Sequence, residues 1–189
     1  MPNFFSAFTN DVFRPLATLL IPGAIGISTW FIALIWHFPK LGDLIARNHT
    51  ESGFVIFLVM VFTGMVFEDI GARWEVLLDH WADERTSDEH SRNWVAYLQT
   101  AFKSDPVGRR YARTLVLRLK FELGTAFAML SGALGLIWLA VLGLGYRTTI
   151  LLEVLCLVFT GWLLAEAKDT HKVLSKTRAI LLGDITVVE

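Results

Sequence analysis

The chain has little cysteine and little charge. Its 189 residues include one cysteine, and only 19% of them are charged, with 17 Lys and Arg against 18 Asp and Glu. The single cysteine, Cys156, excludes a disulfide framework and a cysteine-based zinc site within one chain. The formal net charge of −1 gives no overall field that would recruit a polyanion, so we expect no direct binding of nucleic acid.

Hydrophobic residues make up 54% of the sequence, and the mean hydropathy is +0.51. This composition is too apolar for an ordinary soluble domain. Four apolar stretches predict four transmembrane helices at about 16–38, 53–69, 123–144 and 149–166. We therefore expect an all-α integral membrane protein that forms a single membrane domain over residues 1–189.

The regions outside these spans also carry helical patterns. Phe4, Phe5 and Phe8 recur at helical spacing among polar residues, which predicts an amphipathic helix at the membrane surface over 1–14. The helical pattern of the second, third and fourth spans continues into polar sequence. We expect these helices to extend into the cytoplasm, where the segment at about 70–120 and the tail at 167–189 would lie.

The orientation follows from the basic residues, because cytoplasmic segments of membrane proteins are enriched in Lys and Arg. The segment between the second and third spans and the tail are rich in both residues. The other two loops hold only Lys40, Arg47 and Arg147. We predict a multi-pass protein of the inner (plasma) membrane with both termini in the cytoplasm.

Carboxylates occur near the cytoplasmic ends of the spans, where ionisable groups are costly. At ~1.5 Å per residue, Glu68 lies ~22 Å and Glu166 ~25 Å below the outer ends of their helices, and Glu75 and Glu122 lie ~33 Å below. The hydrocarbon layer is ~30 Å thick. We predict a buried polar cluster at this level that contains Glu68, Glu75, Asp79, Arg118, Lys120, Glu122 and Glu166.

This cluster has three interpretations. The first, which we favour, is a set of ion pairs that fixes the register of the helices, because cations and carboxylates occur in near-equal supply. The second is a metal site built from Glu68, Glu75, Glu122 and His171, although these residues lack the spacing of a known ligand motif. The third is a binding site beside the cluster for a cytosolic partner or an anionic ligand. Its basic face would contain Arg109, Arg110 and Arg113.

Small residues form a stripe along the inner half of the third span, at Gly124, Ala128, Gly132 and Gly135. Such stripes let helices in lipid pack closely. The stripe has two interpretations, packing within one protomer or a face for self-association. A homo-oligomer is expected, since four spans in a chain of this size give a small unit.

These features favour a non-enzymatic, oligomeric membrane protein that presents its cytoplasmic face to a soluble protein or signal, with no cofactor and no catalytic residue. A pore-forming or membrane-perturbing effector is one version. The size and layout resemble those of small bacterial membrane subunits, including those of defence operons, and the resemblance is one of architecture only. The alternative is a metal-dependent membrane enzyme that acts on a lipid or peptide at the cytoplasmic interface.

Overall fold

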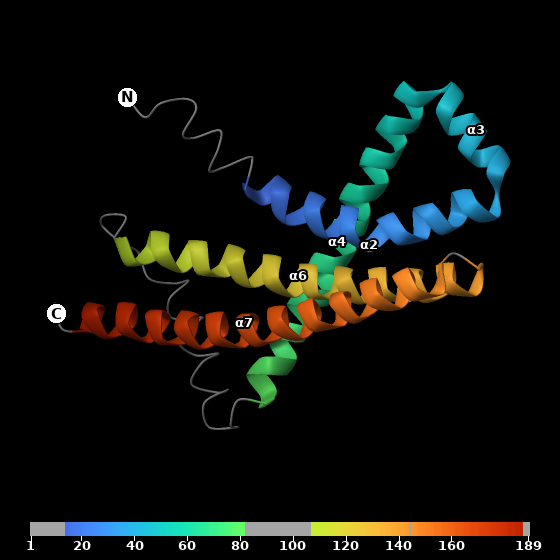
Figure 1. The fold of residues 1–189 in the computed structure, drawn as a ribbon. Coiled ribbons are helices and arrows are strands. Elements are labelled where there is room, and N and C mark those ends of the chain that lie inside the picture. The colour runs from blue at the N-terminus through green and yellow to red at the C-terminus, as the bar shows by residue number, and fades with distance from the viewer. Residues whose placement is uncertain (1–13, 82–106, 144, 187–189) are drawn as a thin grey trace.

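The computed structural model describes residues 14–81, 107–143 and 145–186, and this part of the chain contains helices and turns but no strand. The helices are α2 (Arg14–His37), α3 (Pro39–Arg47), α4 (His49–Trp81), α6 (Val107–Val141) and α7 (Tyr146–Thr186) (Figure 1). The prediction of an all-α protein is confirmed. Nearly all of the predicted surface helix at 1–14 and the middle of the predicted cytoplasmic segment, at 82–106, fall outside the described residues.

Four of these helices are long and apolar enough to cross a membrane, as predicted. Their apolar stretches are Leu16–His37, His49–Glu75, Tyr111–Val141 and Tyr146–Thr177. The second stretch differs from the prediction, which began it near residue 53 and made it short. α4 begins at His49 instead, so the helix includes the polar residues before Gly53.

Three of the helices are much longer than a bilayer requires. At ~1.5 Å per residue, the 33 residues of α4 measure about 50 Å, the 35 of α6 about 52 Å and the 41 of α7 about 62 Å. The hydrocarbon layer is about 30 Å thick. Each of these helices is therefore long enough to continue well beyond a membrane core.

α6 is the central helix of the bundle, since it packs against α2, α4 and α7. Half of the residues in the most apolar stretch of α6 are buried, whereas only 11% of those in the corresponding stretch of α4 are. α2 and α6 run in the same direction, α7 returns antiparallel beside α6, and α4 crosses the others steeply (Figure 1). We call the end with the N-terminus of α6 and the C-terminus of α7 the charged end, and the end with α3 and the α6–α7 turn the loop end.

Two hydrophobic cores follow α6 from one end to the other. At the charged end, Leu119 and Leu123 of α6 pack with Ala167 and Leu174 of α7, and all four are at most 1% exposed. At the loop end, Ala33 of α2 packs with side chains of α6. The pairing of α6 with α7 therefore has a core that reaches into the part of both helices that carries charged side chains.

α2 and α4 touch where a glycine of each meets the backbone of the other. A Cβ atom added to Gly23 would overlap the carbonyl oxygen of Met60, and one added to Gly64 would overlap the carbonyl oxygen of Leu19. Glycine is the residue that allows such close approach. Gly23 and Gly64 thus form a crossing of the two helices.

The connection between α2 and α4 contains α3, a helix that the sequence analysis did not predict. Pro39 occupies its first turn, where the missing backbone N–H costs nothing. Gly42 faces Ile35 of α2, and an added Cβ there would lie 3.1 Å from Ile35 Cγ2. The glycine that lowers helix propensity in this segment thus allows α3 to fold back onto α2. At the other connection, Gly143 has a φ of 87°, which suits the tight α6–α7 turn.

Candidate functional site

The charged side chains of α6 point to both of its neighbours at the charged end. Arg118 and Lys120 are two residues apart, which corresponds to ~200° around a helix, so they leave α6 on opposite sides. Arg118 Nη2 donates to Glu166 Oε1 of α7. Lys120 Nζ donates to Glu68 Oε1 of α4 at 2.6 Å. These two contacts link the central helix to α7 on one side and to α4 on the other.

Glu122 is the most deeply buried charged group in the described part of the chain. Its side chain is 6% exposed, whereas those of Arg118 and Glu166 are 50% and 38% exposed. Arg118 Nε donates to Glu122 Oε1 at 2.6 Å, one helical turn away. One guanidinium therefore serves two carboxylates, and the pairing of Glu122 with Arg118 provides the charge compensation that a buried carboxylate needs.

Two buried oxygen atoms beside this ion pair have no hydrogen-bond partner within the described residues. They are Oε2 of Glu122 and Oγ1 of Thr125, one turn further along α6. Two buried threonines of α7 behave differently: Thr160 donates to the carbonyl of Cys156 at 2.8 Å, and Thr149 to that of Tyr146 at 3.0 Å. A buried polar atom without a partner costs about 1–3 kcal/mol, so Thr125 is a local weak point of α6.

The structure thus joins five of the seven predicted cluster residues in ion pairs: Glu68, Arg118, Lys120, Glu122 and Glu166. Glu75 is half-buried on α4. The side chain of Asp79 lies outside the described residues, as do those of Arg109 and Arg110. Arg113, the third residue of the predicted basic face, is exposed.

The four residues of the alternative metal site are not gathered. Glu68 and Glu122 bond to cations on opposite sides of α6, and His171 is a buried residue of α7. Among the residues that the structure describes, no group of three or more His, Cys, Asp or Glu side chains is placed to hold a metal ion. The geometry of this region is that of ion pairs between helices.

The three glycines of the predicted stripe lie against α2 of the same protomer, and all four members of the stripe are buried. An added Cβ at Gly124 would lie 3.8 Å from Pro22 Cγ, and one at Gly132 would lie 3.6 Å from the carbonyl oxygen of Ile25. Hydrogen bonds reinforce this seam. Ser131 Oγ donates to the carbonyl of Gly26 at 3.0 Å, and Trp30 Nε1 donates to that of Ser131, also at 3.0 Å. Of the two interpretations of the stripe, this geometry favours packing within one protomer.

Sequence reasoning missed the crossing glycines Gly23 and Gly64 and the partnerless Thr125. The signal for the glycines was present, since Gly64 is an isolated glycine in an apolar run, and such a glycine marks a close approach. No signal singles out Thr125, because its surroundings depend on how α6 is covered by its neighbours.

No protein-family model, curated protein or solved structure matches this chain. The function is therefore inferred from the residues and their geometry alone.

Proposed function

We propose that the protein is a non-enzymatic membrane protein that crosses the bilayer four times and presents its charged end in the cytoplasm to a soluble partner. The observation that carries the proposal is the packed α6–α7 pair. Both helices exceed the thickness of a membrane core, and they remain in contact at the charged end, where their cores are fully buried and the surface carries cations. Such a pair is a rigid platform whose outer face is available for binding.

The orientation is supported by the distribution of positive charge. Of the 17 Lys and Arg residues in the sequence, three belong to the loop end, namely Lys40, Arg47 and Arg147, and the other 14 occur towards the charged end or in the segments that lead to it. This asymmetry is the pattern expected of cytoplasmic segments. It supports an orientation with both termini in the cytoplasm and the α6–α7 turn outside.

The ion pairs support a structural role for the buried charges. In a bilayer, a charge on a helix is stable when it faces protein and is paired, as Glu122 and Glu68 are here. Catalysis needs carboxylates that remain available to a substrate, and both Glu122 and Glu68 are bonded to cations of α6. We propose that the pairs between helices, Lys120 with Glu68 and Arg118 with Glu166, fix the angular positions of α4 and α7 around the central helix.

The partner would bind on the basic face at the N-terminus of α6, which contains Arg109, Arg110 and the exposed Arg113. An acidic surface on a soluble protein suits this face, because complementary charge accelerates association and selects partners. We further propose that the protein self-associates in the membrane. A membrane-perturbing activity of such an assembly would appear as release of a dye from vesicles that contain the purified protein.

The orientation is tested with single-cysteine variants, which the chain allows because Cys156 is its one cysteine. Cys156→Ala would be combined with Lys176→Cys at the charged end or Arg147→Cys at the loop end. We expect an impermeant thiol reagent added to intact cells to label the second variant and not the first. The reverse pattern would overturn the orientation.

The partner is tested by purification after crosslinking from cells, with Arg109→Glu/Arg110→Glu/Arg113→Glu as the variant. Arg147→Glu is the control, because it also reverses an exposed cation but at the loop end. We expect soluble proteins captured by the wild type and the control to be lost from the triple variant. Equal capture by all three proteins would count against a partner on this face.

A further inference from the structure

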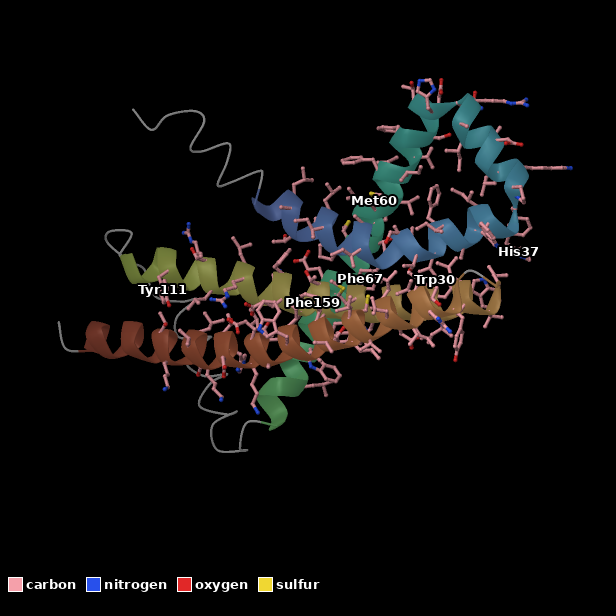
Figure 2. All side chains as sticks on the ribbon, viewed as in Figure 1. Trp30, His37, Met60, Phe67, Tyr111 and Phe159 are labelled. Carbon is pink, nitrogen blue, oxygen red and sulfur yellow. The ribbon has the colours of Figure 1, made fainter. Side chains whose placement is uncertain are left out.

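The outward surface of α7 changes abruptly from apolar to basic. Val154 and Leu157 are exposed. They lie 14 and 11 residues before Lys168, close to whole numbers of helical turns at ~3.6 residues per turn, so they share its face of α7. From the next turns onward, three exposed lysines follow at a spacing of four residues: Lys168, Lys172 and Lys176. Residues four apart lie on one face of a helix, so these lysines form a ladder along α7. Nitrogen-tipped side chains leave this half of α7 on the side away from α6 (Figure 2).

The lysines of the ladder carry little compensating negative charge. Lys172 Nζ lies 3.5 Å from Asp169 Oδ1, and both side chains are strongly exposed, so this pair is weak. Lys168 and Lys176 form no ion pair with any residue in the described ranges. The arrangement leaves a row of ammonium groups that solvent or a ligand can reach.

The ladder lies at the depth of the cytoplasmic headgroup layer. Counted at ~1.5 Å per residue from residue 149, the outer end of the fourth span, Lys168 lies ~28 Å, Lys172 ~34 Å and Lys176 ~40 Å down. The hydrocarbon layer ends at ~30 Å. The headgroup layer is about 5–7 Å thick on each side of the hydrocarbon, and a lysine side chain can bend towards it along its own helix. All three ammonium groups can therefore reach the phosphates of one leaflet.

We propose that Lys168, Lys172 and Lys176 bind the phosphate groups of anionic phospholipids. The ladder continues directly from an exposed apolar surface that acyl chains would cover, and this continuity favours a lipid over a soluble acidic protein. The inference goes beyond the proposed function and uses other residues, since the partner face lies on α6. Its success or failure is independent of whether a soluble partner exists.

The experiment measures lipid binding to the full-length protein, delipidated in a neutral detergent, by native mass spectrometry. The probes are phosphatidylglycerol, phosphatidylcholine with the same acyl chains, and inorganic phosphate. The variant is Lys168→Gln/Lys172→Gln/Lys176→Gln. The matched control is Lys40→Gln/Arg47→Gln/Arg147→Gln, which removes three exposed cations at the loop end. A second variant, Lys168→Arg/Lys172→Arg/Lys176→Arg, should keep the affinity for phosphatidylglycerol.

We expect the wild type to prefer phosphatidylglycerol over phosphatidylcholine. The preference should fall about fivefold for each lysine removed, or roughly a hundredfold for the triple variant, and it should weaken as salt is added. The control should retain it. The proposal would be overturned if the wild type bound both lipids equally or if the control lost the preference as well. It would also be overturned if millimolar inorganic phosphate displaced the lipid, or if the ladder captured an acidic soluble protein in place of lipid. A melting curve confirms that the glutamine variant is folded, and the arginine variant separates loss of charge from loss of structure.

Discussion

The crossing of α2 and α4 at Gly23 and Gly64 makes a sharp prediction. In the variant Gly64→Ala, the new methyl group would overlap the carbonyl oxygen of Leu19, which belongs to the backbone of α2. A side chain could rotate away from such a contact, but a helix backbone can yield only if the two helices separate. The close packing between α2 and α4 would then be lost along the crossing.

The size of the effect is set by two opposing terms. Overpacking a well-packed contact costs about 1–3 kcal/mol. Replacing glycine by alanine within a helix contributes a stabilisation of ~1 kcal/mol. The net destabilisation of Gly64→Ala should therefore lie between about zero and 2 kcal/mol. This range overlaps zero, so a single variant cannot decide the question and a reference on the same helix is required.

Gly53 supplies that reference. It also lies within α4, and an added Cβ there would meet no atom within 4 Å. Gly53→Ala therefore shows the helix-propensity gain without the clash, and the two variants should differ by about 1–3 kcal/mol. The assay is unfolding in mixed micelles by increasing mole fraction of a denaturing detergent, followed by circular dichroism. If the two variants unfold at the same mole fraction, α2 and α4 do not cross at Gly64.

Three further predictions concern the charged end. Thr125→Val removes a buried hydroxyl that has no partner among the described residues and should stabilise the protein by up to about 1 kcal/mol. Thr160→Val removes a hydroxyl that donates a hydrogen bond, so it should not stabilise the protein. The same unfolding assay compares the two variants, and equal effects would refute the distinction. Glu68→Ala should reduce the yield of folded, assembled protein before it reduces any activity, as measured by size-exclusion chromatography, and a variant that assembles normally yet is inactive would restore a catalytic interpretation. The exchanged pair Glu68→Lys/Lys120→Glu should recover part of the stability that either single change removes, because the 2.6 Å contact between α4 and α6 is rebuilt with opposite polarity. Failure of the double variant to exceed the worse single variant would show that the two side chains are not coupled.

The sequence allowed the long helices and part of the charged end to be predicted, because both depend on local pattern. Apolar runs near bilayer length predict helices α2, α4, α6 and α7, and the i, i+4 spacing of Arg118 and Glu122 places them side by side on any helix. The partners across helices do not follow from the pattern. Glu166 and Glu68 are each one of several carboxylates at a similar depth, and only the rotation of each helix decides which carboxylate a cation meets.

The same limit explains the glycines and α3. Small residues on α6 indicated a close contact without indicating with which helix, and the structure places them against α2. Gly23 and Gly64 carry the same kind of signal, yet each helix contributes one glycine to the crossing, and a pair that meets across two helices leaves no periodic pattern. α3 was missed because Gly42 and the charged residues around it resemble a loop, and folding back onto Ile35 compensates for the low helix propensity.

The opposed directions of Arg118 and Lys120 have a mechanical consequence. A turn of α6 about its own axis by one residue step, ~100°, would carry both side chains away from their carboxylates at once. A tilt of α7, in contrast, would strain only the contact of Arg118 with Glu166. If a partner bound at the charged end moves these helices, we expect the motion to travel to the loop end as a tilt of one outer helix against a central helix that does not rotate.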